Sequence, residues 1–303
     1  MKLFKSIYKI ILHFLFVIIF LSTSQVKSLD KFEKSHSVSN YFSGILLLND
    51  NQYEESFKYL KKLNGLESSH KNYSVRYLYS LINSGNLKEA FNYSKKLEKQ
   101  NLDSFESHLI SGVFYLKNSK KDKAQKYFLK AKSKNSKLIF NNYLSSSLHI
   151  WSNLSNLNKA SLEIDKLDER FENLKKIQNV FLNCYFENSN TNNIFFKMIS
   201  NKNIDFSRYN YFYSNYLVSV RQNIKAKKII EKSLIKYPRN LLLNQYSFNL
   251  KNSKKNFNFD CKDKSHVTAE ILYIAANALS AQSIYPLSNF YLNLSKFLNE
   301  KFL

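Results

Sequence analysis

Small residues recur along the chain at a nearly constant spacing. Ser56, Ala90 and Ala124 stand 34 residues apart, and three further markers follow along the chain at nearly the same spacing. The full series of markers is Ser56, Ala90, Ala124, Ala160, Ile194 and Ala226. Twelve residues before the markers stand Gly44, Leu78, Gly112, Leu148, Leu182 and Ser214. Nine residues before them stand the large apolar residues Leu47, Leu81, Tyr115, Trp151, Tyr185 and Leu217. This periodicity predicts repeated helix pairs, each pair occupying one period.

Polar segments mark the turns between the predicted helices. Residues 83–86, Asn-Ser-Gly-Asn, precede a helical pattern that begins at Leu87 and contains the marker Ala90. Pro238 follows the last marker by twelve residues and ends the regular register. Beyond it we expect a helix over 241–250, a polar irregular segment over 251–265, and a last helix pair over 268–282 and 286–299. Pro286 suits the first turn of the final helix, where its missing N–H costs nothing.

On these positions, residues 37–298 resemble the tetratricopeptide repeat family. The resemblance implies an all-α, right-handed superhelical solenoid of about seven antiparallel helix pairs, in which a small residue lets the two helices of a pair approach closely. Residues 269–273 and 288–292 are similar to the mid-region of long exported alphaproteobacterial proteins of this family. The chain thus resembles the N-terminal half of those proteins, which typically continue for several more repeats. The resemblance implies no reaction.

The N-terminal segment has the order of a secretory signal peptide. Lys2, Lys5 and Lys9 precede an apolar run over 10–21, and a polar stretch leads to a possible cleavage site after Ser28. The apolar run is shorter than the roughly twenty residues of a membrane span, although retention as an uncleaved anchor stays open. We therefore expect an exported protein, periplasmic or anchored by this segment. The predicted organisation is 1–28 signal peptide, 29–240 about six repeats, 241–267 irregular helix and loop, and 268–303 final helix pair.

Composition excludes several function classes. The chain has four glycines, none within ten residues of another, so no glycine-rich phosphate loop can be written. The formal net charge is +23, and cleavage after Ser28 removes four lysines and no acidic residue, which leaves +19. Only five of the 46 basic residues are arginines, whose planar fork suits bidentate phosphate contacts. We therefore interpret the charge mainly as a solvated lysine-rich surface, with contact to an anionic membrane or envelope polymer left open.

No pattern in the sequence indicates catalysis or a metal. Cys184 and Cys261 are far apart, so we expect two buried free thiols; export would permit a disulfide, but the separation disfavours one. The segment 260–266, followed by Glu270, holds ligand-type residues but only one pair at helical ligand spacing. No metal, cofactor or enzymatic activity is therefore expected.

The family resemblance implies a binding groove lined by the first helix of each pair. Carried over position by position, the groove-facing set is Tyr79, Asn83, His149, Asn153, Asn183, Arg208, Tyr211 and Asn215. Amide and aromatic side chains suit an extended peptide, so we expect a non-catalytic protein-interaction scaffold of the bacterial cell envelope with an unidentified protein or peptide partner. Two alternatives remain: a basic binder of nucleic acid or anionic polymer, which the signal peptide and the scarcity of arginine oppose, and an accessory factor of an envelope biosynthesis enzyme.

Overall fold

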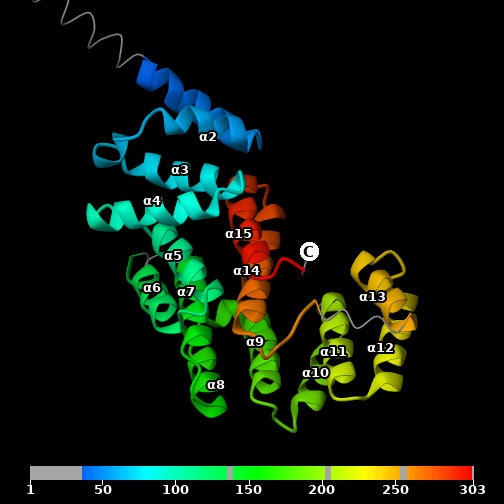
Figure 1. The fold of residues 1–303 in the computed structure, drawn as a ribbon. Coiled ribbons are helices and arrows are strands. Elements are labelled where there is room, and N and C mark those ends of the chain that lie inside the picture. The colour runs from blue at the N-terminus through cyan, green and yellow to red at the C-terminus, as the bar shows by residue number, and fades with distance from the viewer. Residues whose placement is uncertain (1–35, 135–138, 202–205, 253–257, 302–303) are drawn as a thin grey trace, which may run out of the picture. The chain divides into compact units, whose positions relative to one another are not determined.

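Every element of regular structure in the described residues is a helix, which confirms the all-α prediction (Figure 1). The computed structural model describes residues 36–134, 139–201, 206–252 and 258–301, so the predicted signal peptide lies outside the described residues. Residues 36–49 are helical. The elements that follow are α2 (Tyr53–Lys61), η1 (Leu66–Ser68), α3 (Lys71–Asn83), α4 (Leu87–Lys99), α5 (Phe105–Lys117), α6 (Lys121–Lys134), α7 (Ile139–Ser152), α8 (Leu157–Asp165), η2 (Glu169–Phe171), α9 (Glu172–Tyr185), α10 (Thr191–Ile199), α11 (Ser207–Ser219), α12 (Asn223–Lys236), α13 (Leu241–Lys251), α14 (Lys264–Ser280) and α15 (Tyr285–Leu298).

Several helices end in a left-handed residue that is not glycine. Asn101, Ser119, Glu187 and Arg221 have φ between 52° and 63°. Each lies two residues beyond its helix, and the next N–H returns to a carbonyl in the last turn, as in the 2.8 Å bond from Gln222 N to Leu217 O. These caps let the chain turn between helices with very few glycines, each at a conformational cost of about 1 kcal/mol.

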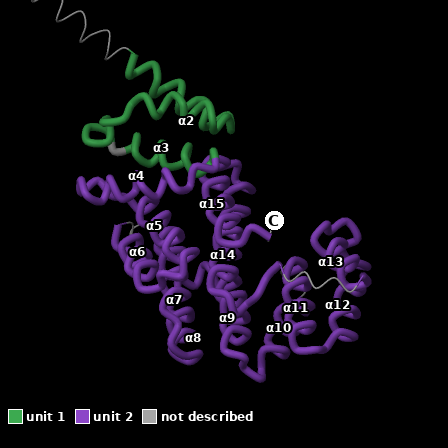
Figure 2. The backbone as a smooth tube through the Cα atoms, viewed as in Figure 1, with its two compact units in different colours: residues 1–84 green, residues 85–303 purple. Residues whose placement is uncertain are grey.

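The helices form two compact units, Met1–Ser84 and Gly85–Leu303 (Figure 2). In the first unit, α2 packs on α3 and approaches the helical residues 36–49 closely. The Ser56 hydroxyl donates a 2.7 Å hydrogen bond to the Gly44 carbonyl, and a Cβ built on Gly44 would lie 2.7 Å from Leu60. The small marker Ser56 therefore lies at a close approach of two helices, as the resemblance implies, and its partner is the residue twelve positions earlier.

The same close approach recurs in the second unit, where neighbouring helices pack in pairs. A Cβ at Gly112 in α5 would lie 2.5 Å from the Phe128 ring in α6. Ser214 in α11 donates a 3.1 Å hydrogen bond to the Ala226 carbonyl in α12. The markers Ala90, Ala124, Ala160 and Ala226 are all at most 3% exposed. The fifth marker is wrong by one residue, because Phe195 is buried whereas Ile194 is partly exposed.

The predicted final helix pair is present as α14 and α15, with Pro286 in the first turn of α15. In this pair, too, two residues twelve positions apart are in contact, although the sequence pattern did not reveal it. Ser288 donates a 2.8 Å hydrogen bond to the Ala276 carbonyl. This pair packs on helices from the start of the second unit, α14 on α7 and α15 on α5 (Figure 1). Lys117 Nζ, for example, donates a 3.3 Å bond to the Leu298 carbonyl, 181 residues further along the chain.

These return contacts differ from a linear solenoid, in which each repeat contacts only its neighbours. The helix pairs are thus established by the structure, whereas the superhelical solenoid stays a prediction. Helices α10 to α13 follow α9 and precede the returning pair in the chain, and they lie together to one side of α9 and α14 (Figure 1).

A polar cluster joins α4 to α6. Glu98 accepts a 2.7 Å hydrogen bond from the Tyr127 hydroxyl and forms ion pairs with Lys95 and Lys130. Burial raises the pKa of the Glu98 carboxyl group, but the hydrogen bonds from Lys130, Lys95 and Tyr127 outweigh burial and lower this pKa to about 2. The ionised carboxylate therefore stabilises the folded state.

We expect Gly112→Ala to destabilise the protein although alanine is the better helix former by about 1 kcal/mol. The added methyl group would overlap the Phe128 ring, so the free energy of unfolding should fall by about 1–3 kcal/mol, measured by urea denaturation. Combining it with Phe128→Leu should cost less than the sum of the two single changes. A Gly112→Ala variant as stable as the wild type would contradict the close approach.

We expect Glu98→Gln to remove part of the acid sensitivity of the protein. Because the pKa of Glu98 is lower in the folded state, its stabilisation is complete above the unfolded pKa near 4.5 and is lost as the pH falls toward 2. When the pH is lowered from 7 to 3, the free energy of unfolding should decrease in both proteins. The decrease should be about 2 kcal/mol larger in the wild type than in Glu98→Gln. Glu231→Gln, at an exposed position, is the control, and its free energy of unfolding should decrease as much as that of the wild type. If Glu98→Gln showed the same pH dependence as the wild type, the polar cluster would not be a source of acid sensitivity.

Candidate functional site

Helix α11 is the centre of the region that holds the candidate site. Its sequence is rich in tyrosine, and Tyr209, Tyr211, Phe212 and Tyr213 are all at most 5% exposed. Four aromatic residues within five successive positions cannot share one face of a helix, so α11 is buried on several sides. Helices α10, α12 and α13 pack around it.

A disulfide bond between Cys184 and Cys261 closes this region, so the expectation of two free thiols is wrong. The two Cα atoms lie 5.9 Å apart although 77 residues separate them in sequence. The return of the chain after α13 brings Cys261 beside the end of α9. The separation in sequence did not predict whether the two cysteines are bonded, because a chain that returns can bring distant residues together.

The returning segment is also held by packing and hydrogen bonds. The Phe259 ring lies 5.1 Å from that of Phe181 in α9 and 4.5 Å from that of Phe212 in α11, between ring centroids. Asn215 Nδ2 donates a 2.6 Å hydrogen bond to the Phe259 carbonyl. Because these contacts come from two helices, the position of Phe259 is fixed relative to both.

An ion pair joins the start of α11 to α14. The Arg208 guanidinium donates hydrogen bonds of 3.0 Å to both carboxylate oxygens of Glu270, and Tyr209 donates a further bond of 3.1 Å. Glu270 is fully buried, and burial raises its pKa while Arg208 and Tyr209 act in the opposite direction. The Arg208 guanidinium also lies 3.9 Å from the centroid of the Tyr273 ring. This arrangement is a structural contact between two helices.

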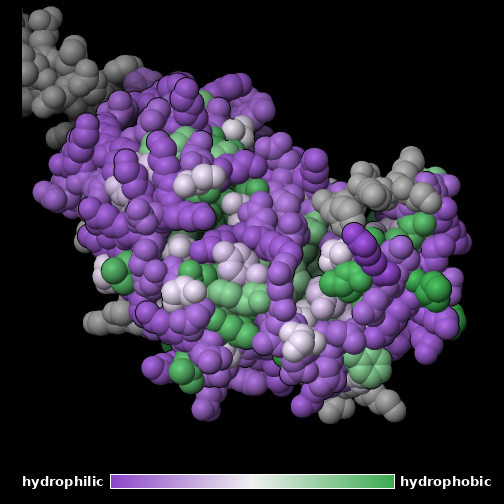
Figure 3. Space-filling model, turned by 60° about the horizontal axis from the view of Figure 1, so that its bottom comes forward, coloured by the Kyte–Doolittle hydropathy of each residue, from purple (hydrophilic) through white to green (hydrophobic). Residues whose placement is uncertain are grey.

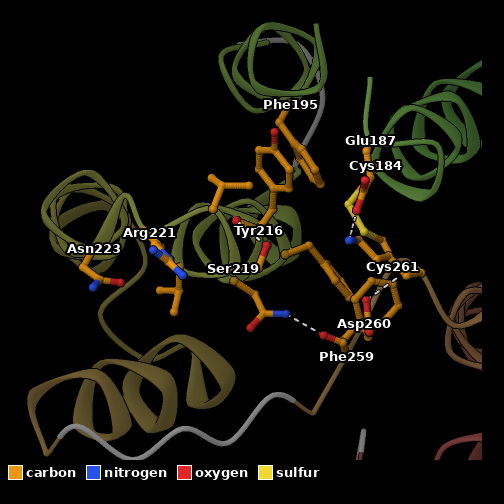
Figure 4. A pocket seen from close by; sticks show the side chains of 15 residues that line it. Cys184, Glu187, Phe195, Tyr216, Ser219, Arg221, Asn223, Phe259, Asp260 and Cys261 are labelled. Atoms are coloured by element: carbon orange, nitrogen blue, oxygen red, sulfur yellow. Dashed lines mark hydrogen bonds and ion pairs between the residues drawn. A yellow bond between two sulfur atoms is a disulfide. The ribbon is translucent and has the colours of Figure 1, made fainter. Parts of the chain in front are cut away.

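A pocket of about 660 Å³ opens between these elements (Figure 4). Figure 4 shows Phe195, Tyr216 and Phe259 around it, with the disulfide on one side and Arg221 on the other. The lining residues are Cys184, Glu187, Phe195, Phe212, Asn215, Tyr216, Val218, Ser219, Val220, Arg221, Asn223, Phe259, Asp260, Cys261 and Lys262. The aromatic rings of Phe195, Phe212 and Phe259 are themselves at most 3% exposed and so form a fixed apolar floor.

The pocket wall includes a buried polar atom that has no hydrogen-bond partner among the described residues. Asn215 is 6% exposed, and while its amide nitrogen bonds the Phe259 carbonyl, its Oδ1 is buried and accepts no hydrogen bond. A buried acceptor left without a donor costs about 1–3 kcal/mol. The pocket wall therefore contains an acceptor whose hydrogen-bonding capacity is unused.

The charged residues at the edge of the pocket differ in their pairing. Glu187 and Lys262 form an exposed ion pair with each other, and the hydrogen bond from Lys262 lowers the pKa of Glu187. Arg221, in the turn between α11 and α12, forms no ion pair with any described carboxylate. The left-handed cap of α11 places Arg221 at this edge.

A second hollow of about 540 Å³ adjoins the pocket and shares Arg221 and Asn223 with it. We call it the basic hollow, and its lining is Arg221, Gln222, Asn223, Ile224, Lys225 and Lys228. No acidic residue is among them. Lys225 donates a 3.1 Å bond to Asn192 Oδ1, which leaves its positive charge unneutralised.

Three of the eight residues predicted to line a groove are buried. Tyr79 is 8%, Tyr211 2% and Asn215 6% exposed. The Tyr211 ring packs edge-on against Tyr246, with centroids 4.8 Å apart. Burial of these side chains gives them a role in packing, and of the eight residues the structure brings only Asn215 to the pocket.

The other five predicted groove residues are spread along the chain from α3 to α11, and none of them lines the pocket. Asn83 is partly exposed in α3 of the first unit, and Asn153 is exposed after α7. Asn183 donates a 2.8 Å bond to the Asn179 carbonyl in its own helix, and Arg208 is engaged with Glu270. His149 is partly buried in α7, and burial lowers its pKa. A role for these residues in a shared groove stays a prediction.

The sequence analysis missed most residues of the pocket. Phe259 and Cys261 belong to a segment assigned as an irregular loop, and no sequence pattern shows that this segment returns to α9 and α11. The available signal was chemical: exactly two cysteines in a chain with a signal-like segment are compatible with one disulfide. Arg221 was visible as one of only five arginines, but its position relative to an aromatic pocket was not.

The ligand-type residues around position 260 are engaged in other contacts. Cys261 is in the disulfide, His266 Nδ1 accepts a 3.0 Å hydrogen bond from Asp260 N, and Glu270 pairs with Arg208. Among the described residues, no group of three potential ligands is placed to hold a metal ion. Over the same part of the chain, no helix combines the length and apolar character that a membrane crossing requires.

Comparison with models of known protein families finds no match to this sequence, and a search of curated proteins finds no similar sequence. The resemblance to tetratricopeptide repeats therefore depends on the repeat pattern and on the helix pairs.

We expect removal of the disulfide by Cys184→Ala with Cys261→Ala to lower the free energy of unfolding by about 2–4 kcal/mol. The bond closes a long loop, and without it the unfolded chain gains conformational freedom. Urea denaturation with and without dithiothreitol measures the effect. The reductant should destabilise the wild type by a similar amount and leave the double variant unchanged; equal stability of the oxidised wild type and the double variant would contradict this role.

Proposed function

We propose that the chain is a non-catalytic binding protein of the bacterial cell envelope, in which tetratricopeptide-like helix pairs support a site for a segment of a partner protein. The observation that supports this most directly is the pocket at α11, with its apolar floor and the unpaired acceptor Asn215 Oδ1. An entering apolar side chain would cover the floor, and a backbone N–H of the partner would donate the hydrogen bond that the Asn215 oxygen lacks.

The pocket is held in shape before a ligand arrives. The disulfide, the packing of Phe259 and the Arg208–Glu270 pair each join the returning segment or α14 to helices earlier in the chain. A wall that is already ordered loses little conformational entropy on binding, which favours affinity. On the face shown in Figure 3 hydrophilic residues predominate.

The titratable groups at the pocket favour binding without turnover. A general acid near neutral pH requires a raised carboxyl pKa. The Glu187 carboxylate instead has a pKa lowered by the hydrogen bond from the Lys262 ammonium group, and Asp260 accepts a 2.9 Å bond from Lys262 N. These groups act as fixed charges at the edge of the site.

The disulfide supports the proposed export. Disulfides persist in oxidising compartments such as the bacterial periplasm and are rare in the cytosol. A signal-like N-terminal segment and a disulfide in the same chain therefore indicate the same compartment.

The proposal is tested by selecting peptides from a random library on the oxidised full chain. Ser219→Trp serves as the blocked variant, because Ser219 is exposed at the pocket and a tryptophan there would occupy it without disturbing the core. We expect peptides that bind the wild type at micromolar concentrations and bind Ser219→Trp at least tenfold more weakly. Selected peptides that bind both proteins equally, or a library that yields none, would overturn the proposal.

A further inference from the structure

We infer that the pocket and the basic hollow form one continuous site for an acidic peptide segment that contains a large apolar side chain. This inference rests on the proposed function and specifies the partner chemistry of that site. Arg221 and Asn223 line both hollows, so the two hollows adjoin at these side chains and one ligand segment could contact both.

The charge of the basic hollow selects for carboxylates. Arg221, Lys225 and Lys228 line it, and none of the three forms an ion pair with a carboxylate of the described residues. Helix α12 begins at this point with no acidic residue in its first turn, so the partial positive charge of its N-terminus adds to that of the side chains. Over its whole length α12 carries five lysines and one glutamate. An acidic ligand would relieve the repulsion among these cations.

Each of the two hollows also has an exposed apolar side chain in its lining. Val220 at the pocket is 42% exposed and Ile224 at the basic hollow is 77% exposed. Val220 directly precedes Arg221 and lines the pocket, and Ile224 follows Arg221 by three residues and lines the basic hollow. A ligand that combined an apolar anchor with adjacent acidic residues would cover these side chains and neutralise the cations at the same time.

The aromatic floor favours a peptide over a single-stranded nucleic acid. Bases stack on the open faces of aromatic side chains. Here Phe195, Phe212 and Phe259 are nearly fully buried, and Tyr216 alone among the aromatic lining residues is partly exposed. The unpaired acceptor of Asn215 matches the N–H donors of a peptide backbone. The chemistry thus fits an acidic peptide with an apolar anchor.

The test uses fluorescein-labelled peptides and fluorescence anisotropy with the oxidised full chain. The first probe has a tryptophan flanked on each side by two glutamates; three others replace the glutamates by glutamines, replace them by lysines, or replace the tryptophan by alanine. We expect the acidic tryptophan peptide to bind at least tenfold more tightly than each of the others. Raising sodium chloride from 0.05 to 0.5 M should weaken its binding severalfold and leave the glutamine peptide unaffected.

Two substitutions probe the cations without threatening the fold. Arg221→Gly removes the guanidinium at a left-handed position where glycine is at least as stable, so weaker binding cannot be attributed to unfolding. Lys228→Glu reverses one charge of the basic hollow, and Lys227→Glu is its matched control on the same helix, outside the lining of both hollows. We expect about tenfold weaker binding of the acidic peptide for Arg221→Gly and Lys228→Glu, and less than threefold for Lys227→Glu.

The outcomes separate the inference from the proposed function. Equal binding of the acidic and glutamine peptides, both blocked by Ser219→Trp, would overturn the inference and leave the proposed function standing. Equal losses for Lys227→Glu and Lys228→Glu would also overturn it, because the effect would then be one of net charge. Tighter binding of a labelled deoxythymidine oligonucleotide, weakened by the same two substitutions, would assign the site to nucleic acid instead. Absence of any peptide binding would defeat both proposals.

Discussion

The close approach of two helices at small residues is the constraint on which the repeated structure depends. Gly112 leaves no room for a methyl group beneath Phe128, and Ser214 and Ser288 each reach a backbone carbonyl of the facing helix across a spacing of twelve residues. At such distances a side-chain hydroxyl can satisfy a carbonyl and the neighbouring apolar residues close around it. Because successive helix pairs bring equivalent positions together, small residues recur in the sequence at a spacing of about 34.

The region of the proposed site depends on a second kind of contact, between segments far apart in the chain. After α13 the chain returns to α9 and α11, where the disulfide, Phe259 and the Arg208–Glu270 pair hold it. The Arg208–Glu270 ion pair fixes the relative position of α11 and α14 more than it stabilises the fold, since the cost of desolvating two charges offsets much of their attraction. Their combined effect is a pocket whose walls come from α9, α10, α11 and the returning segment (Figure 4).

The local elements of this fold are predictable from sequence, and the site is not. The markers Ala90, Ala124 and Ala226 are buried as their spacing predicts, and Pro286 begins α15 as expected. The fifth marker failed because Phe195, one residue beyond Ile194, takes the buried position, and a large side chain there hides the small-residue signal. The groove set carried over from the repeat family includes Asn215, but Tyr211 beside it packs on Tyr246, because α11 is surrounded on more sides than the first helix of an ordinary pair.

The amino-acid sequence by itself determined the all-helical class and the pairing of neighbouring helices, and it placed the start of α4 and the bounds of α13, α14 and α15 to within four residues. These follow from local periodicity and capping, which depend on residues within one or two helices of each other. Only the tertiary structure decided that Cys184 and Cys261 are bonded, that α14 and α15 return to α7 and α5, and that Arg221 lies between an aromatic pocket and a row of lysines. The disulfide joins residues 77 positions apart, and the return of α15 to α5 brings together residues 181 positions apart. No periodic pattern encodes where a returning chain comes to lie.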